Sequence, residues 1–362
     1  MTTPRGGELL GASDCRRDRK EILIVGQDNL FADVPNCRVD HVCTGKSMTP
    51  GVERPAGSAG IAKVAARIVR GRYDLIVLPA VDFRWSHDAS RRKRWLRSFI
   101  SALAGLRPVS SILNRTLARK STQIIVLDRY DSHEVLQDYL QRLKSARYYF
   151  KTNLLAADNG RTVWFDKRSG CALRFLPYWL ATNQYPLPAA QNKEIDVFFA
   201  GDVNSPERKF SLAALQELEQ EGFKIHIAPQ RLGFSEYLSV MARSWLTLSP
   251  QGLGYNGFRH YESMLVGSIP LINRPTPAIV HDFAHGGNSF LYSIEGRDIQ
   301  QVARAALQDK TQLARIVAGL RQFVVENHSF AAVGRYLLEQ VTESQDPARR
   351  PECEKGEREC SK

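Results

Sequence analysis

The chain alternates between short strand-like patterns and longer stretches whose apolar residues recur with helical spacing. In the first half, strand patterns occur at 21–25, 38–43, 74–78, 123–127 and 147–151, and helical patterns at 58–70, 90–106 and 132–145. Several strand patterns, such as the ILIV run, are apolar without interruption, as expected for strands buried on both faces. Strands that alternate with helices predict a mostly parallel, doubly wound sheet.

The second half repeats this rhythm. Strand patterns occur at 195–200, 223–228, 245–248, 269–272 and 289–292, and helical patterns at 206–220, 234–243 and 258–266, followed by 298–308, 310–326 and 330–342. Between the halves, residues 177–192 hold three prolines and show no period, which is typical of a linker. The pattern therefore predicts two α/β domains.

The expected domains are an N-terminal one at 21–178 and a C-terminal one at 193–330. A terminal helix at 331–344 follows, and whether it crosses back to the first domain is left open. Residues 1–20 form an expected disordered leader, and the charged, proline-bearing residues 345–362 an expected disordered tail.

Composition supports a globular protein with an ordinary core. The 362 residues are 43% hydrophobic, no window holds 18 consecutive apolar residues, and the N-terminus lacks the apolar region of a signal peptide. The six cysteines have neither zinc-ligand spacing nor a dense disulfide framework. A reduced cytoplasm is the simplest setting.

The formal charge of +12 is unevenly distributed, because residues 91–120 hold nine Lys or Arg and no acidic residue. We expect an ordinary helix with a solvated basic face here. The alternative is a basic amphipathic helix that lies on an anionic membrane surface, which would make the protein peripheral to the membrane. A nucleic-acid partner is not expected, since no reading motif or interleaved aromatics accompany the charge.

The most informative segment is 245–274, which reads as strand, glycine-rich loop, short helix and second strand. The glycines let the backbone turn before the helix, so the free amides of its first turn face the loop and favour an anion. Arg259 lies in that first turn, where the helix dipole disfavours a cation, and this suggests a negatively charged partner. Glu262 follows one turn later on the same face and is able to accept hydrogen bonds from two sugar hydroxyls.

Three motifs in this segment are L-S-P-x-G at 248–252, R-x-Y-E at 259–262 and G-S-I-P-L-I at 267–272. Together they resemble the nucleotide-sugar-binding segment of GT-B glycosyltransferases, in particular the exostosin-like and spore-maturation CgeB-like families. The resemblance covers roughly residues 120–330 and includes a Y-F-K element at 149–151. It implies two Rossmann-like doubly wound parallel-sheet domains that face each other across a cleft.

The same resemblance implies roles for single residues. Glu262 would bind the ribose and Arg259 the phosphates of the nucleotide. The loop residues Gly252, Gly254 and Asn256 would lie near the diphosphate.

A second loop, after the strand pattern at 195–200, points to the same ligand. Gly201 permits a close backbone approach, and Ser205-Pro206 is typical of a helix start. Arg208 and Lys209 fall in the first turn of that helix, where they would neutralise a diphosphate leaving group; a solvated basic pair is the alternative. This arrangement matches the F-x-G…R pattern of many GT-B donor domains.

Glycosyl transfer with inversion needs a general base, and in GT-B proteins it comes from the N-terminal half. Asp131 and Asp128, in the DRYD sequence after the strand at 123–127, are the preferred candidates. Aspartates after strands are also common as helix caps and turn formers. The other residues considered are Asp28, Asp82, His87 and His133.

Two departures from common GT-B patterns bear on mechanism. Many retaining enzymes carry a further glutamate eight positions before the one that matches Glu262, and this position is Gly254. The expected reaction is therefore inverting. Because the cleft has no D-x-D motif, no divalent metal or other cofactor is expected, and cationic side chains and helix amides would stabilise the leaving diphosphate.

The sequence thus predicts a glycosyltransferase that moves a sugar from a nucleotide-diphosphate donor to an acceptor hydroxyl. The first alternative is a non-catalytic relative that keeps the nucleotide-sugar pocket as a binding or scaffolding module. The second is a polyanion-binding surface protein that uses residues 91–120 and whose affinity falls steeply with salt.

Overall fold

The computed structural model describes residues 19–43, 61–80, 122–143, 145–155, 164–166, 171–188, 192–203, 206–252, 254–277, 279–281, 283–293 and 295–343. The basic segment 91–120 lies outside these ranges. So do the predicted disordered ends, apart from residues 19 and 20. None of the described helices is both long and apolar enough to cross a membrane.

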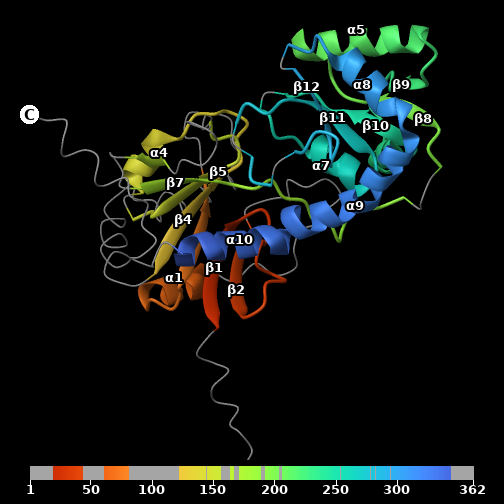
Figure 1. Ribbon diagram of the computed structural model, residues 1–362. Helices are drawn as coiled ribbons and strands as arrows, with labels where there is room; N and C mark the ends of the chain where they lie inside the picture. The colour runs from red at the N-terminus through yellow and green to blue at the C-terminus, as the bar shows by residue number, and fades with distance from the viewer. Residues whose placement is uncertain are drawn as a thin grey trace, which may run out of the picture.

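A first, mostly parallel sheet is built from the N-terminal half (Figure 1). Its strands are β1 (Lys20–Gly26), β2 (Cys37–Cys43), β3 (Leu75–Pro79), β4 (Gln123–Asp128), β5 (Tyr148–Lys151), β6 (Trp164–Asp166) and β7 (Cys171–Phe175). They are ordered β2-β1-β3-β4-β5-β7-β6, and only the β6–β7 pair is antiparallel. The sequence pattern missed β6 and β7. The strand expected at 147–151 is β5, which lies inside the sheet between β4 and β7.

Helices cover both faces of this sheet, and strand β1 shows why. Leu23 and Val25 pack in a cluster with α1 (Ile61–Val69) and α4 (Gln137–Arg142). Ile22 and Ile24 point to the opposite face and pack against α10 (Phe330–Glu343). Successive side chains of a strand point to opposite faces, so an uninterrupted apolar run is what a doubly covered strand requires. Helix α10, from the end of the chain, thus completes the core of the first sheet (Figure 1).

The second sheet is entirely parallel and has the order β12-β11-β10-β8-β9. Its strands are β8 (Ile195–Phe199), β9 (Ile225–Ile227), β10 (Ser244–Leu248), β11 (Ile269–Asn273) and β12 (Phe290–Tyr292). The accompanying helices are α5 (Pro206–Gln220), α6 (Phe234–Ala242), α7 (Phe258–Leu265), α8 (Ile299–Gln308) and α9 (Lys310–His328). These elements match the strand and helix patterns of the second half closely.

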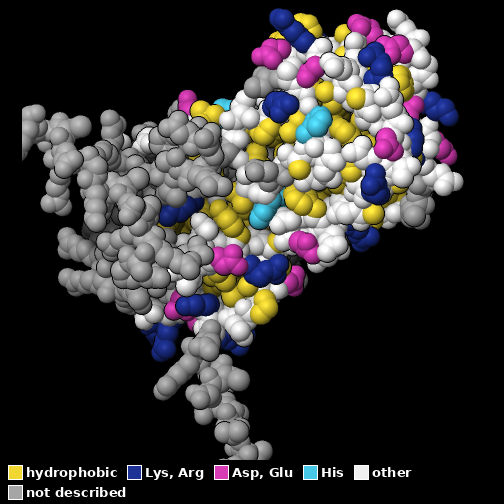
Figure 2. All heavy atoms as spheres, viewed as in Figure 1, with side chains coloured by type: hydrophobic (Ala, Val, Ile, Leu, Met, Phe, Trp, Pro, Cys, Tyr) yellow, Lys and Arg dark blue, Asp and Glu magenta, His cyan; other side chains and the backbone are white. Residues whose placement is uncertain are grey.

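The segment after β7 and the junction between α9 and α10 connect the two sheets, and these segments run side by side. The backbone N–H of Leu180 donates to the carbonyl of His328, and a β-bridge joins Leu180 to Ser329. The ring of His328 bonds the carbonyl of Tyr178 at 2.8 Å. Figure 1 shows α9 and α10 running one after the other from the second sheet to the first. On the face drawn in Figure 2, acidic and basic side chains of the second domain are interspersed and form no single charged patch.

Candidate functional site

The candidate donor site lies at the carboxyl ends of β8 and β10. These two strands are neighbours, but β9 lies beyond β8 and β11 beyond β10. The chain therefore leaves β8 and β10 in opposite directions, and ligands of open α/β sheets bind at such a switch point; the space between the two following loops is here called the crevice. The sequence-predicted residues Gly201, Gly252, Arg208 and Arg259 all come from these loops or from the helices that follow them.

Arg259 extends from the first turn of α7 toward the loop after β8. Its guanidinium lies 5.3 Å from the ring of Phe199 and so close to Gly201 that a Cβ there would collide with Nη2. Gly201 also has φ 153°, a conformation that favours glycine. The buried Nε of Arg259 has no hydrogen-bond partner among the described residues.

Arg208 reaches the same crevice from the first turn of α5. Its Nη1 donates to the carbonyl oxygen of Asp202 at 2.8 Å, and a Cβ on Gly252 would lie 3.1 Å from its Nη2. Burial lowers the pKa of Arg208, and the positive charge of Arg259 lowers it further. The crevice thus brings together two partly desolvated cations. Lys209 is exposed on the next position of the helix.

Glu262 lies one turn deeper along α7 and is only 4% exposed. Its Oε1 accepts a hydrogen bond from the hydroxyl of Tyr185 at 3.1 Å, and its Oε2 accepts one from Tyr237 at 3.0 Å. Burial raises the pKa of Glu262, against the opposing effect of the two tyrosine hydrogen bonds and the Arg259 charge. No sequence pattern indicated this tyrosine pair, because Tyr185 belongs to the connecting segment and Tyr237 to α6.

Gly254 and Asn256 have a different environment from the predicted one. A Cβ on Gly254 would lie 2.6 Å from the carbonyl oxygen of Asp131 and 2.8 Å from Nδ2 of Asn153. The backbone N–H of Asn256 donates to Oδ1 of Asn153 at 3.2 Å, and its Nδ2 donates to the carbonyl of Thr152 at 3.0 Å. Both residues therefore join the two domains. Their place near the diphosphate stays a prediction, and the structure adds contacts with the first domain that the sequence did not indicate.

The glycine-rich loop is fixed from below by a histidine. His260 Nδ1 bonds the hydroxyl of Ser249 at 2.8 Å, and its Nε2 bonds the carbonyl of Tyr255 at 2.8 Å. Burial lowers the pKa of His260 to about 4, so the ring is neutral at neutral pH. These two bonds tie Ser249 and Tyr255 of the loop to the first turn of α7.

The two predicted bases differ sharply in accessibility. Asp128 is fully buried, pairs with the equally buried Lys151 at 2.9 Å, and accepts a hydrogen bond from the hydroxyl of Tyr149. A carboxylate enclosed in this way cannot reach an acceptor, so the structure contradicts a role for Asp128 as the base. The sequence could not show this, because Lys151 comes from the next strand.

Asp131 is exposed, and its backbone carbonyl lies beside Gly254 at the edge of the donor loop. Partial desolvation raises the pKa of Asp131, against the nearby charges of Arg129 and Lys151. His133 lies two residues further on and is also exposed, and its Nδ1 bonds the carbonyl of Asn153 at 2.9 Å. If Nδ1 carries the proton, Nε2 is free to accept one. Asp82 and His87 lie outside the described residues.

Comparison with known proteins bears on the fold of the chain. No protein-family model matches the chain, and no curated protein matches it. A solved glycosyltransferase from Rickettsia africae is similar in structure, with 11% sequence identity and a TM-score of 0.50 over 91% of this chain and 100% of that one.

Two further structures are less similar. Sucrose-phosphate synthase from Thermosynechococcus elongatus has 13% identity and a TM-score of 0.47 over 90% of this chain and 99% of that one. HepE from Anabaena, in complex with UDP and glucose, has 13% identity and a TM-score of 0.44 over 90% and 100%. At such identities similarity concerns the fold alone. The predicted fold class is confirmed: two Rossmann-like α/β domains in the GT-B arrangement.

Proposed function

We propose that this chain transfers a sugar from a nucleotide-diphosphate donor to an acceptor hydroxyl, with inversion and without a divalent metal. The observation that carries the proposal is the convergence of Arg208 and Arg259 on one crevice at the switch point of the second sheet. The two like charges lie in the first turns of two helices, where the helix dipole disfavours cations, and the repulsion from Arg259 lowers the pKa of Arg208 although Asp202 and Glu262 lie near the pair. A diphosphate carries the negative charge that would relieve this repulsion.

The arginines and the α7 amides would act on the leaving group. As the bond between the anomeric carbon and the diphosphate breaks, negative charge grows on the phosphate oxygens. Guanidinium groups already fixed against Gly201 and Gly252 stabilise that charge without reorganising. They would provide the neutralisation that a metal supplies elsewhere.

Glu262 would bind the ribose hydroxyls. Each carboxylate oxygen accepts about two hydrogen bonds, and each now receives one from a tyrosine. Because Glu262 is buried, the ribose would reach it only after Tyr185 moves aside. Tyr185 lies on the segment that connects the two domains, so opening of the cleft would move it.

Asp131 would serve as the general base. It would take the proton of the acceptor hydroxyl while the acceptor oxygen bonds to the anomeric carbon. Its raised pKa makes the carboxylate a stronger base, and its backbone carbonyl lies beside Gly254 of the donor loop, which supports this role. His133 is the second candidate for the same step.

Thermal stabilisation by UDP, GDP, ADP, CDP and dTDP tests the donor site. The cognate nucleotide at 100 times its dissociation constant should stabilise the protein by about 2.7 kcal/mol. Arg259→Met and Glu262→Gln should lose most of that response, whereas Arg335→Met, an exposed arginine on α10, should keep it. If no nucleotide stabilises the protein, or if all three variants respond alike, the donor site is not where we place it.

The second candidate function is nucleotide-sugar binding without transfer. It is favoured by one observation, namely that Asp128 is enclosed and the base role rests on exposed residues alone. Release of free nucleoside diphosphate from the donor by the wild type, but not by Asp131→Asn, would identify the protein as an enzyme. His133→Gln is the parallel variant that tests the second candidate base. Tight nucleotide binding without release of nucleoside diphosphate in the presence of any acceptor would identify the protein as a binding module.

We also infer kinship with the exostosin-like and CgeB-like families from the motifs at 248–272.

A further inference from the structure

The first sheet carries a pocket that the donor chemistry does not use. It has a volume of about 230 Å³ and lies at the carboxyl ends of β1, β3 and β4. Here too the chain leaves neighbouring strands in opposite directions, because β2 lies beyond β1 and β4 lies beyond β3. Ligands in open α/β sheets bind at such switch points, and this sheet has its own.

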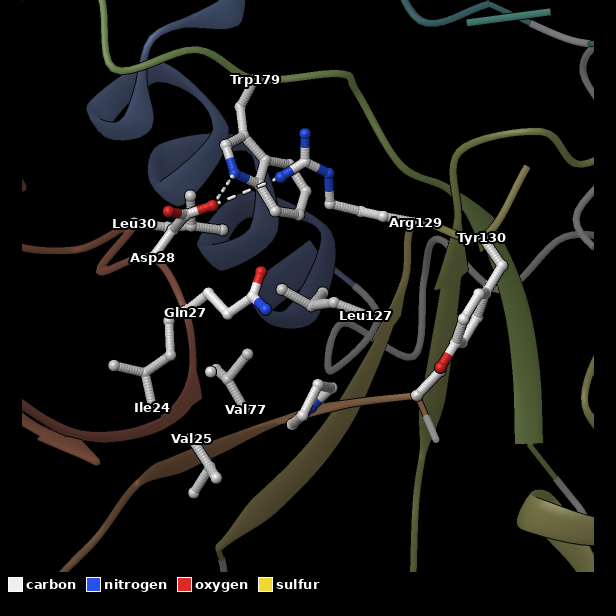
Figure 3. Close-up of a pocket in the computed structure, with 13 residues that line it drawn as sticks. Ile24, Val25, Gln27, Asp28, Leu30, Val77, Leu127, Arg129, Tyr130 and Trp179 are labelled. Atoms are coloured by element: carbon white, nitrogen blue, oxygen red, sulfur yellow. Dashed lines mark hydrogen bonds and ion pairs between the residues drawn. The ribbon is translucent and has the colours of Figure 1, made fainter. Parts of the chain in front are cut away.

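Most of the pocket wall is apolar. The strands contribute aliphatic side chains, among them Ile24, Val77 and Leu127 (Figure 3). One end is closed by a rigid polar cluster, in which Oδ2 of Asp28 accepts hydrogen bonds from Nε1 of Trp179 at 3.0 Å and from Nη1 of Arg129 at 3.3 Å. The carboxylate and the guanidinium neutralise each other, so this end offers a ligand no net charge.

A polar side chain outside this cluster, that of Gln27, also faces the pocket. The side chain of Gln27 extends into its middle (Figure 3). Its carboxamide has no hydrogen-bond partner among the described residues. A carboxamide donates and accepts, so it suits a hydroxyl or carbonyl on an otherwise apolar ligand.

The pocket and the donor site share one segment. Arg129 and Tyr130 line the pocket, and the carbonyl of the next residue, Asp131, lies beside Gly254 of the donor loop. The guanidinium of Arg129 also lies 5.7 Å from the ring of Phe258 in the first turn of α7. The pocket therefore lies beside the segment that carries the proposed base.

We propose that this pocket binds the apolar, ring-containing part of the acceptor, with Gln27 bonded to its polar atom. The inference rests on the proposed function, and it names the acceptor class: a neutral molecule with a compact apolar group rather than a bare sugar. Size supports this, since an apolar cavity of about 150 Å³ holds benzene and this pocket is larger.

The probe for the test is 2-naphthol, followed by ligand-observed NMR with the full-length protein. Gly26 lines the pocket, and a Cβ added there meets nothing within 4 Å, so Gly26→Leu should fold and fill the space. Gly319→Leu on α9 is the matched control, because a Cβ there also meets nothing within 4 Å. We expect Gly26→Leu to weaken 2-naphthol binding at least tenfold and Gly319→Leu to leave it unchanged.

Two further measurements sharpen the result. Gln27→Met keeps the volume and should weaken 2-naphthol binding about two- to tenfold through the lost hydrogen bond. Methyl glucoside should not displace 2-naphthol. Absence of 2-naphthol binding, equal binding to Gly26→Leu and wild type, or displacement by methyl glucoside would each overturn the proposal.

Nucleotide binding is measured in parallel on the same variants. Gly26→Leu should keep its thermal response to the cognate nucleoside diphosphate, because the two sites are separate. A protein that binds 2-naphthol in this pocket but no nucleotide would refute the glycosyltransferase function and leave the pocket standing. A protein that binds a nucleotide but not 2-naphthol would refute only the proposed acceptor class.

Discussion

Replacement of Gly254 by alanine should open the cleft without unfolding either domain. A Cβ at this position would lie 2.6 Å from the carbonyl oxygen of Asp131 and 2.8 Å from Nδ2 of Asn153. Comfortable carbon–oxygen contacts begin near 3.3 Å, so the two surfaces must separate by about 0.7 Å. Overpacking of this kind costs about 1–3 kcal/mol.

This steric strain can be relieved without unfolding of either domain. Asp131 and Asn153 belong to the first domain and Gly254 to the second, so a rigid separation of the domains relieves the clash. A cost near 2 kcal/mol would shift the balance of closed and open forms by about 30-fold. The core clusters of the two sheets include none of the three residues in contact, although Tyr255 and Leu154 beside them belong to these clusters, so most of the core packing would be kept.

Amide hydrogen exchange at Asn256 measures this shift directly, because its N–H donates across the contact to Asn153. We expect exchange about 30-fold faster in Gly254→Ala than in the wild type, with a melting temperature within a few degrees. Sugar transfer should fall with the closed population.

The control is Gly257→Ala, three residues along the same loop, where a Cβ meets nothing within 4 Å. It changes only the residue before α7 and should leave the exchange of Asn256 unchanged, at a cost of at most about 1 kcal/mol in helix capping. Wild-type exchange in Gly254→Ala would refute the interdomain contact. A large fall in its melting temperature would show that the strain is absorbed within a domain instead.

Three further predictions concern ionisable side chains that are buried or partly buried. Lys151→Met leaves Asp128 buried without its ion-pair partner, so urea unfolding should show a loss of about 3–5 kcal/mol, partly recovered by adding Asp128→Asn. Lys193 donates to three backbone carbonyls. Lys193→Met should therefore cost about 1–3 kcal/mol in the same assay with unchanged nucleotide affinity, and a loss of affinity would contradict a purely structural role. Burial lowers the pKa of His260 from 6.5 to about 4, so the unfolded chain binds the proton first as the pH falls. Through His260 alone, stability should decline by roughly 2–3 kcal/mol between about pH 6.5 and 4. His260→Gln should therefore make that part of the profile less steep, and His328, whose pKa is also lowered by burial, accounts for slope that remains; an equal slope in both proteins would refute the assignment.

Much of the fold was readable from local pattern. The sequence pattern predicted five of the seven described strands of the first sheet and all five of the second, and Pro206 and Gln220 bound α5 as expected. Strand β6 was missed because three residues carry too little periodicity, and its partner β7 was missed with it. The helix expected at 132–145 is confined to Gln137–Arg142, since the DRYD loop runs further than its polarity indicated.

The sequence by itself determined that two α/β domains would form, and it pointed to a loop and a helix start suited to an anion. Those properties depend on neighbours along the chain: which faces are apolar, where glycine lets the backbone turn, and where a cation meets a helix dipole. Tertiary structure alone decided which residues meet. It paired Asp128 with Lys151, gave Glu262 two tyrosines, and turned Gly254 into an interdomain contact. Burial and pairing depend on segments that pack together from distant parts of the chain, and a local pattern carries no record of those partners.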